Sequence, residues 1–315
     1  MQTRQLGNTD MHITSIGLGT WAIGGSGWAA AWGAQDDNDS IAAIQHAVDL
    51  GLNWLDTAAV YGLGHAEEIV GRALKGRANR PYIFTKCSRT IGPDGKFTGV
   101  LKAASIRQEV EASLRRLQVD VIDLYQIHWP VPDEDIEEGW RTLAELKQAG
   151  KVRYIGVSNF NASQLQRIQE IAPVSSLQPP YSLVRREIEK EILPFCQQHT
   201  IGVIVYSPMA SGLLTGAMTP ERILSLPEDD WRKHDAQFRE PQLSRNMALV
   251  TLLHTIGKRH DKTPGEVAIA WTLHNPAVTS AIVGSRRPAQ LDQVVGAADL
   301  KLSDEEIQEI EAFEH

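Results

Sequence analysis

Short apolar segments alternate along the chain with longer segments in which apolar residues recur every three or four positions. The short runs predict buried strands, and the longer spacing predicts amphipathic helices. The predicted strands are Ile16–Gly19, Asn53–Leu55, Tyr82–Thr85, Val121–Ile127, Val152–Val157, Ser175–Gln178, Val203–Val205 and Ser280–Val283. The predicted helices are Asn38–Leu50, His65–Lys75, Ser105–Leu117, Pro132–Ala149, Ala162–Ile171, Arg186–His199, Arg245–Arg259, Pro264–His274, Pro288–Gly296 and Asp304–Phe313. This alternation predicts parallel strands joined by right-handed helical crossovers.

Two of the predicted helices begin with a recognisable capping pattern. Thr263 and Ser303 each precede a glutamate by three residues, at Glu266 and Glu306. A hydroxyl and a carboxylate at that spacing can each satisfy a free backbone N–H at a helix start. The pattern therefore places two helix N-termini near the end of the chain.

Eight strands that alternate with helices predict a closed (β/α)8 barrel, the TIM barrel, as one domain over residues 1–315. A doubly wound open sheet is the structural rival. The segment after the first predicted strand lacks the Gly-x-Gly-x-x-Gly spacing of a dinucleotide-binding turn, which disfavours that rival. Residues Met1–Ser15 precede the barrel, and Asn8-Thr9-Asp10 suits the turn of a small hairpin that caps its bottom.

Composition narrows the class of protein further. The 315 residues include 31 basic and 39 acidic side chains, for a formal net charge of −8, and basic residues do not cluster. Nucleic acid is therefore disfavoured as a partner. The two cysteines, Cys87 and Cys196, are too few for a disulfide framework and predict free thiols in a reducing cytosol, with one bridge left open.

The chain carries no sequence signal for membrane insertion or export. The polar N-terminal residues Met1–Gln5 do not resemble a signal peptide, and no apolar run approaches the length of a membrane span. We therefore expect a cytoplasmic protein without a membrane partner, and no obligate protein partner is evident.

Two long connections follow predicted strands. They span residues 88–104 and 207–244, and both contain Gly and Pro. Loops of this length in a compact domain are commonly functional. Because they follow strands, we expect them to rise over the catalytic face and to carry substrate specificity.

Four residues at or near strand ends combine into a set that suits proton donation. Asp56 ends one strand, Tyr61 follows in a short turn, and Lys86 and His128 end two more strands. A neighbouring lysine cation is expected to lower the tyrosine pKa from about 10. Such a tyrosine could protonate the oxygen of a carbonyl that receives a hydride.

Further polar residues follow other predicted strands. Asn159, Gln178 and Tyr206 stand just past strand ends. The carboxyl ends of barrel strands share one face, where active sites are built. One converging site is therefore expected.

Each of the four residues also has an ordinary structural interpretation. Tyr61 suits packing in a turn, Lys86 a surface position, His128 a core position and Asp56 a helix N-cap. The apolar residues before Lys86 argue for burial, and a buried lysine needs a partner such as Asp56. Only the combination favours catalysis.

The motifs taken together resemble the aldo-keto reductase superfamily, and among its members the bacterial NADPH-dependent reductases related to the potassium-channel β-subunit branch. The matching segments occur in family order: Leu18-Gly19-Thr20-Trp21, Asp56-Thr57-Ala58 with Tyr61-Gly62, Lys86, Gln126-Ile127-His128, Gly156-Val157-Ser158-Asn159-Phe160, Tyr206-Ser207-Pro208 and Ile282-Val283-Gly284-Ser285-Arg286. The resemblance implies Tyr61 as general acid, supported by Asp56, Lys86 and His128.

The resemblance also implies a nicotinamide cofactor, NADPH or NADP+ with NADH as a further option, held without a Rossmann fold. The implied cofactor residues are Gly19, Thr20, Trp21, Asp56, Ser158, Asn159, Gln178, Tyr206, Ser207, Pro208, Gly212, Leu214, Gly284, Ser285, Arg286 and Gln290. Val294 stands where family members often carry an asparagine that contacts adenine. The loop at Ser285 and Arg286 opens a helix and suits the 2′-phosphate of NADPH.

The expected substrate is a small carbonyl compound, with aldehydes first and ketones as a wider range. Trp21, Tyr61, His128 and Trp129 are expected to line its pocket, and Trp28 and Trp32 suit the same cleft or ordinary loop packing. A metal-dependent hydrolase is disfavoured because no closely spaced histidine pair accompanies His128, so no metal is expected. A redox-sensing regulatory subunit with little turnover remains the alternative.

Overall fold

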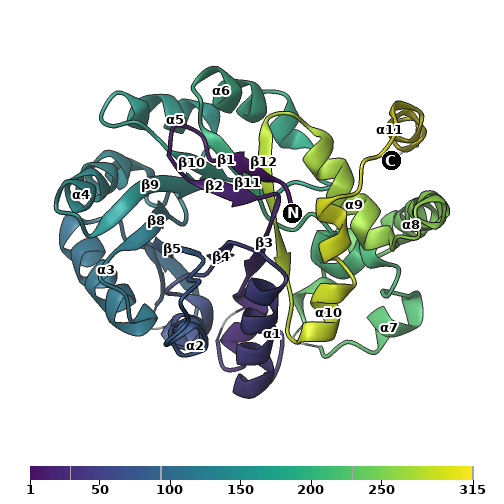
Figure 1. Ribbon diagram of the computed structural model, residues 1–315, viewed down its shortest axis with the longest axis horizontal. Helices are drawn as coiled ribbons and strands as arrows, with labels where there is room; N and C mark the ends of the chain where they lie inside the picture. The colour runs from purple at the N-terminus through teal and green to yellow at the C-terminus, as the bar shows by residue number, and fades with distance from the viewer. Residues whose placement is uncertain (29, 93, 229, 314–315) are drawn as a thin grey trace.

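Eight parallel strands close into a barrel within the residues that the computed structural model describes, which are 1–28, 30–92, 94–228 and 230–313 (Figure 1). The strands are β3 (Ile16–Gly19), β4 (Trp54–Asp56), β5 (Tyr82–Cys87), β8 (Ile122–Ile127), β9 (Val152–Ser158), β10 (Ser176–Gln178), β11 (Gly202–Val205) and β12 (Val278–Gly284). They pair in chain order, and β12 pairs with β3 to complete the ring. The predicted (β/α)8 barrel is confirmed, and the open sheet is excluded.

Helices surround the barrel. They are α1 (Asp37–Asp49), α2 (His65–Leu74), α3 (Ala103–Leu117), α4 (Ile136–Gln148), α5 (Ala162–Gln169), α6 (Ile192–Gln198), α7 (Pro220–Leu224), α8 (Gln242–Arg259), α9 (Pro264–His274), α10 (Pro288–Asp292) and α11 (Asp304–Glu311). Both predicted capping boxes are present, and Asn161 with Gln164 forms another at the start of α5.

Two predicted helices are wrong as continuous elements. Pro288–Gly296 divides into α10 and the 3-10 turn η8 (Val295–Ala298), and Arg186–His199 is interrupted as well. A short 3-10 turn, η4 (Glu187–Glu189), precedes α6, which begins only at Ile192. Pro194 explains the break, because proline lacks a backbone N–H and is tolerated in a helix only within its first turn. The helix therefore starts two residues before Pro194.

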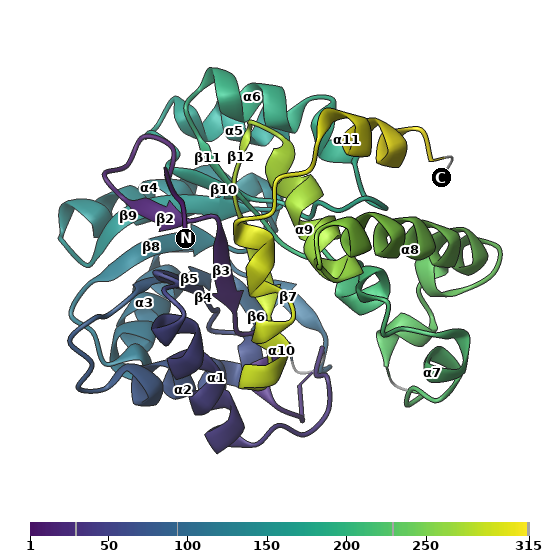
Figure 2. The ribbon, with the colours of Figure 1, turned by 45° about the vertical axis from the view of Figure 1, so that its right-hand side comes forward.

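The N-terminal hairpin forms as predicted and closes the amino end of the barrel strands. β1 (Thr3–Gln5) pairs antiparallel with β2 (His12–Thr14). Leu6, Met11 and Ile13 at this hairpin are fully buried and pack in one cluster with side chains of the barrel strands. In Figure 2 the arrow of β3 points away from this hairpin, towards the side where β6 and β7 lie.

Alternation along β5 separates the barrel interior from the layer beneath the helices. Phe84 belongs to the interior cluster, whereas Ile83 and Cys87 belong to the cluster shared with the helices. Because successive strand residues point to opposite faces, Lys86 points inwards like Phe84. The buried Lys86 side chain therefore lies inside the barrel, next to the apolar interior cluster that contains Phe84.

The long loops contain structure of their own. Residues 88–104 include a second hairpin, β6 (Arg89–Ile91) with β7 (Phe97–Gly99). Residues 207–244 include η5 (Ala210–Thr215), α7, η6 (Trp231–Lys233) and η7 (Ala236–Phe238). The other 3-10 turns are η1 (Trp21–Gly24), η2 (Tyr61–Gly64), η3 (Asp133–Asp135) and η8 (Val295–Ala298).

Packing inside the barrel predicts a sharp intolerance at Gly17. A Cβ there would lie 2.1 Å from Cε2 of Trp54, whose indole Nε1 is fixed by a 3.0 Å hydrogen bond to the Thr14 carbonyl. We expect Gly17→Ala to lower the free energy of unfolding by about 1–3 kcal/mol, the usual cost of overpacking. Gly284→Ala is the control, because its added methyl group would meet nothing within 4 Å. Equal urea unfolding curves for both variants would contradict this packing.

Candidate active site

The predicted polar residues lie together at the carboxyl end of the barrel. Asp56 and Gln178 end β4 and β10, Lys86 is the penultimate residue of β5, and His128, Asn159 and Tyr206 directly follow β8, β9 and β11. Tyr61 opens η2, the turn after β4. Hydrogen bonds and ring contacts connect all seven.

A buried ion pair forms the base of the site. The Lys86 Nζ lies 2.6 Å from Oδ2 of Asp56, and the two side chains are 0% and 4% exposed. Nζ also donates to the Thr57 carbonyl at 2.9 Å and lies 3.4 Å from the Tyr61 hydroxyl. Gln178 donates to the other Asp56 oxygen at 2.8 Å. Both carboxylate oxygens therefore have partners, as a buried charge requires.

The expectation that Lys86 lowers the pKa of Tyr61 is wrong for this arrangement. Burial raises the pKa of the Tyr61 phenol well above its ordinary value, and the nearby Asp56 carboxylate raises it further. The lysine is already paired with that carboxylate at a shorter distance than its distance to the phenol. Tyr61 is therefore held as a neutral phenol with its proton in place.

His128 is held as a neutral imidazole. Burial lowers its pKa well below the ordinary value, and the positive charges of Lys86 and Arg89 lower it further. Its ring meets that of Tyr61 edge to face, with centroids 5.7 Å apart. Its Nδ1 is buried without a hydrogen-bond partner among the described residues.

A chain of hydrogen bonds links the residues expected to hold the nicotinamide carboxamide. Asn159 donates to the Ser158 hydroxyl and to the His128 carbonyl, each at 3.0 Å, and accepts from the Tyr206 hydroxyl at 2.8 Å. Ser158 donates to the Gln178 carbonyl at 2.8 Å. These bonds fix the side chains beside Tyr61 and His128.

The segment after β11 has the backbone shape of an anion-binding loop. Ser207, Ala210, Ser211 and Gly212 all adopt positive φ angles. Successive turns of this kind direct backbone N–H groups into a concave surface that suits phosphate. The side chains of Pro208 and Leu214 are buried, so Leu214 can offer a cofactor only its backbone.

Arg286 is exposed only in part, because the loop after β3 holds it. Its guanidinium donates to the Gln35 side chain at 2.5 Å and to the carbonyls of Trp32 and Ala34, and Gln35 donates back to the Arg286 carbonyl at 2.8 Å. Gln290 accepts from the Arg286 backbone N–H at 2.9 Å.

A concentration of positive charge surrounds Arg286. Burial lowers its pKa, and the neighbouring charges of Arg287 and Arg232 lower it further. Arg232 pairs with Asp230 at 2.6 Å. The Ser285 hydroxyl donates to the Arg287 carbonyl at 2.8 Å, and Gly284 is exposed.

The remaining expected cofactor residues lie after β3. Gly19 packs against Ile282, since a Cβ at Gly19 would lie 2.6 Å from that side chain. The Thr20 N–H donates to the Asp56 carbonyl at 2.9 Å, whereas its buried Oγ1 has no partner among the described residues. This orphaned hydroxyl, with Nδ1 of His128, fits a site that receives a polar ligand. Val294 is buried in the core and offers no polar adenine contact.

Aromatic side chains cover Tyr61. Trp21 stacks on Tyr61 with ring centroids 6.1 Å apart, and Trp28 lies at the same distance from Tyr61. Trp32 lies 6.3 Å from Trp21. Trp129 follows His128 directly. Trp21 and Trp28 thus lie against Tyr61, whereas Trp32 contacts Trp21 and lies under the Arg232 guanidinium.

Cys87 lies behind the site, in the layer beneath the helices. Burial raises the pKa of its thiol well above the ordinary value. Both cysteines are free and buried. The described residues contain no cluster of three or more metal-ligating side chains, and no described helix is long and apolar enough to span a membrane.

Sequence reasoning missed two residues of this region, Arg89 and Gln35. Arg89 opens the second hairpin and lies beside Trp129. Gln35 bonds to Arg286, which is distant in sequence. Neither belongs to a predicted strand end or a motif, and the sequence predicts only a long loop where the hairpin that carries Arg89 lies.

A profile of the aldo/keto reductase family matches residues 15–315. The chain belongs to this family. Family membership and relatives named as reductases support an oxidoreductase that acts on carbonyl groups, and members of the family use nicotinamide cofactors.

Individual relatives cover nearly the whole chain. The aldo-keto reductase YhdN of Bacillus subtilis (strain 168) is 38% identical over 98% of this chain and 92% of its own length. The NADH-specific methylglyoxal reductase of Escherichia coli (strain K12) is 34% identical over 96% of this chain and 95% of its own. The solved structure of the glycerol dehydrogenase AKR11B4 from Gluconobacter oxydans aligns with a TM-score of 0.91 and 39% identity, covering 99% of this chain and 94% of that one.

The buried ion pair gives a prediction about stability. Asp56→Asn would leave the Lys86 charge uncompensated, and we expect it to lower the free energy of unfolding by about 3–5 kcal/mol. The double variant Asp56→Asn/Lys86→Met removes both charges and should recover part of that loss. Urea unfolding of Asp56→Asn, Lys86→Met and the double variant measures the coupling energy between the two side chains. Losses that simply add would contradict the pairing.

Proposed function

We propose that this chain, as a single domain over residues 1–315, is an NADPH-dependent reductase that converts aldehydes, and over a wider range ketones, to alcohols. The observation that carries the proposal is the Tyr61 hydroxyl 3.4 Å from Nζ of the buried Lys86–Asp56 pair, with the His128 ring 5.7 Å from the Tyr61 ring. A bound nicotinamide supplies the hydride to the carbonyl carbon. Tyr61 supplies the proton to the carbonyl oxygen, so that one hydride and one proton give the alcohol.

The neutral phenol suits this role because its proton is present at physiological pH. Its raised pKa does not prevent donation, since the alkoxide that forms on hydride transfer is a stronger base than a phenolate. When the proton leaves, a phenolate remains 3.4 Å from the Lys86 ammonium. Lys86 therefore lies next to the negative charge that proton transfer leaves on Tyr61, although its closer partner is Asp56.

His128 and the amide-bearing residues position the reactants. A neutral imidazole can donate an N–H to the carbonyl oxygen without competing with Tyr61 as an acid. Ser158, Asn159 and Gln178 are placed to hold a carboxamide, and Tyr206 offers a ring to stack against. These residues would hold a nicotinamide beside Tyr61.

The charge around Arg286 favours NADPH over NADH. Burial lowers the pKa of Arg286, the charges of Arg287 and Arg232 lower it further, and Asp230 pairs with Arg232. A 2′-phosphate would relieve this repulsion and accept charge-assisted bonds. One relative is named as NADH-specific, so cofactor preference varies among similar chains and must be measured on this one.

Tyr61→Phe tests the acid. We expect it to lower kcat by about 10²–10⁴-fold, the usual contribution of a positioned acid. Cofactor affinity should stay close to that of the wild type, because the change removes only the hydroxyl. The assay is NADPH oxidation with a panel of aldehydes and ketones. Retention of more than about a tenth of the wild-type kcat would contradict the assignment, and an inactive wild type would favour the regulatory alternative.

Arg286→Ala tests the preference for NADPH over NADH. We expect the wild type to bind NADPH more tightly than NADH, and the variant to lose about tenfold to a hundredfold in NADPH affinity, the worth of a charge-assisted bond. Gln35→Ala is the control, because it releases the same loop without removing charge and should affect both cofactors alike. Tryptophan fluorescence titration measures all the affinities. Equal wild-type affinities, or an NADH preference, would contradict the proposal.

A further inference from the structure

We propose that Arg89 binds an anionic group of the substrate, so that the enzyme favours carbonyl compounds that carry a carboxylate at a distance from the reacting carbonyl. The proposal rests on carbonyl reduction at Tyr61 and adds the class of substrate. It assigns Arg89 to binding only, since the carboxylate takes no part in the transfer of hydride or proton.

The Arg89 guanidinium is held between two aromatic rings. It lies 4.6 Å from the ring centroid of Phe97 and 5.3 Å from that of Trp129. Such stacking leaves the edge of the guanidinium, with its N–H donors, free to bind. No carboxylate, carbonyl or hydroxyl of the described residues accepts a hydrogen bond from Arg89. A half-buried cation that is fixed in place without a counter-ion suits an anionic ligand.

The backbone around Arg89 is anchored on both sides. At the base of the hairpin, the Ser88 N–H donates to the Glu109 carboxylate at 2.9 Å. On the opposite strand, Gly99 pairs with Arg89 and lies so close to the β8–α4 connection that a Cβ there would be 2.1 Å from the Val131 carbonyl oxygen. The guanidinium is therefore pre-positioned rather than carried on a loose loop.

A continuous ring of side chains joins Arg89 to the reacting groups. Trp28 lies 6.1 Å from Tyr61 and 6.4 Å from Phe97, which in turn holds Arg89. On the other side, Trp129 joins Arg89 to its chain neighbour His128, whose ring lies 5.7 Å from Tyr61. A substrate bound at Tyr61 within this ring has apolar walls and a cation at its rim. The cation is close enough to His128 to lower the pKa of that imidazole.

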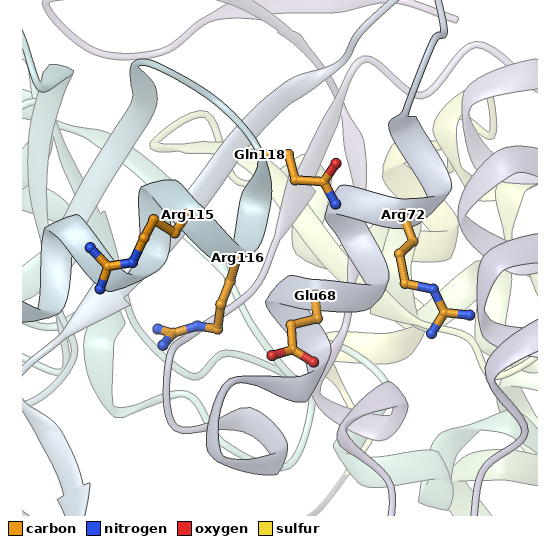
Figure 3. Close-up of a pocket in the computed structure, with 5 residues that line it drawn as sticks. All are labelled: Glu68, Arg72, Arg115, Arg116 and Gln118. Carbon is orange, nitrogen blue, oxygen red and sulfur yellow. The ribbon is translucent and has the colours of Figure 1, made fainter.

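A second group of arginines lies on the outside of the barrel and carries no such site. A pocket of about 340 Å³ lies between α2 and the end of α3 (Figure 3). It is lined by Glu68 and Arg72 of α2, Arg115 and Arg116 of α3, and Gln118, which follows α3. Arg116 is 2.6 Å from the buried Glu67, and Arg72 is 2.7 Å from Asp37. Arg115 forms no salt bridge among the described residues and is exposed in the last turn of α3, on the outside of the barrel. It therefore serves as a control for a change of surface charge.

The test compares two substrates of similar shape. 4-Carboxybenzaldehyde carries a carboxylate, and its methyl ester, methyl 4-formylbenzoate, is neutral. We expect the wild type to show a higher kcat/KM for the carboxylate with NADPH. In Arg89→Gln the ratio of the two kcat/KM values should fall by about tenfold or more, as expected for loss of a charge-assisted contact. Arg89→Lys should give an intermediate ratio, because it keeps the charge and loses the planar fork.

Two outcomes would overturn the proposal. A wild type that prefers the ester excludes an anion site, and an equal loss for both substrates in Arg89→Gln assigns Arg89 a structural role only. Arg115→Gln should leave the ratio unchanged. Binding of benzoate and benzamide to the NADP+ complex, followed by tryptophan fluorescence, decides the question even without turnover. Weaker benzoate binding in Arg89→Gln with unchanged benzamide binding supports the site, and equal effects on both ligands contradict it.

Discussion

The site depends on the ion pair between Lys86 and Asp56. A lysine inside a barrel is tolerated only when its charge is compensated and its donors are satisfied. Asp56 supplies the charge, the Thr57 carbonyl accepts a further bond, and Gln178 occupies the second carboxylate oxygen. Three strands, β4, β5 and β10, therefore have to keep their register for this group to exist. The same register places Tyr61 and His128 above it.

Burial decides the protonation state of each reacting group. It holds the phenol of Tyr61 and the imidazole of His128 in their neutral forms, although one pKa rises and the other falls. The reason is common to both, because a low-dielectric environment penalises whichever form is charged. The pairing of Lys86 with Asp56 keeps the lysine from reversing this for Tyr61. A neutral acid and a neutral hydrogen-bond donor are what reduction of a carbonyl requires.

The barrel and the positions of most strand-end residues could be predicted from the sequence, because both follow from local patterns. Apolar runs fix the strands, and parallel strands bring their carboxyl ends to one face. The pKa of Tyr61 could not be predicted, since it depends on the lengths of contacts to Asp56 and Lys86. Arg89 and Gln35 escaped for a related reason. The partners of these two side chains depend on the conformations of the loops, which the spacing of apolar residues does not predict.

In the proposed function, the loops determine selectivity for cofactor and substrate, and the ends of the barrel strands supply the reacting groups. Gln35 ties the loop after β3 to Arg286, and Phe97 ties the second hairpin to Trp28. The first contact joins the loops after the neighbouring strands β3 and β12, whereas the second joins loops after β3 and β5, which are not paired in the barrel. The scaffold can therefore keep its reacting groups while the choice of cofactor and substrate is adjusted around them.

The most direct test of the account is the ionisation of Tyr61. Tyrosine labelled with ¹³C at Cζ reports the phenolate by NMR, and Tyr61→Phe assigns the resonance. We predict that the Tyr61 resonance does not move up to about pH 10, the ordinary midpoint of a tyrosine. A titration midpoint below that value would mean that Lys86 promotes the phenolate, and it would contradict the conclusion that its charge is taken up by Asp56.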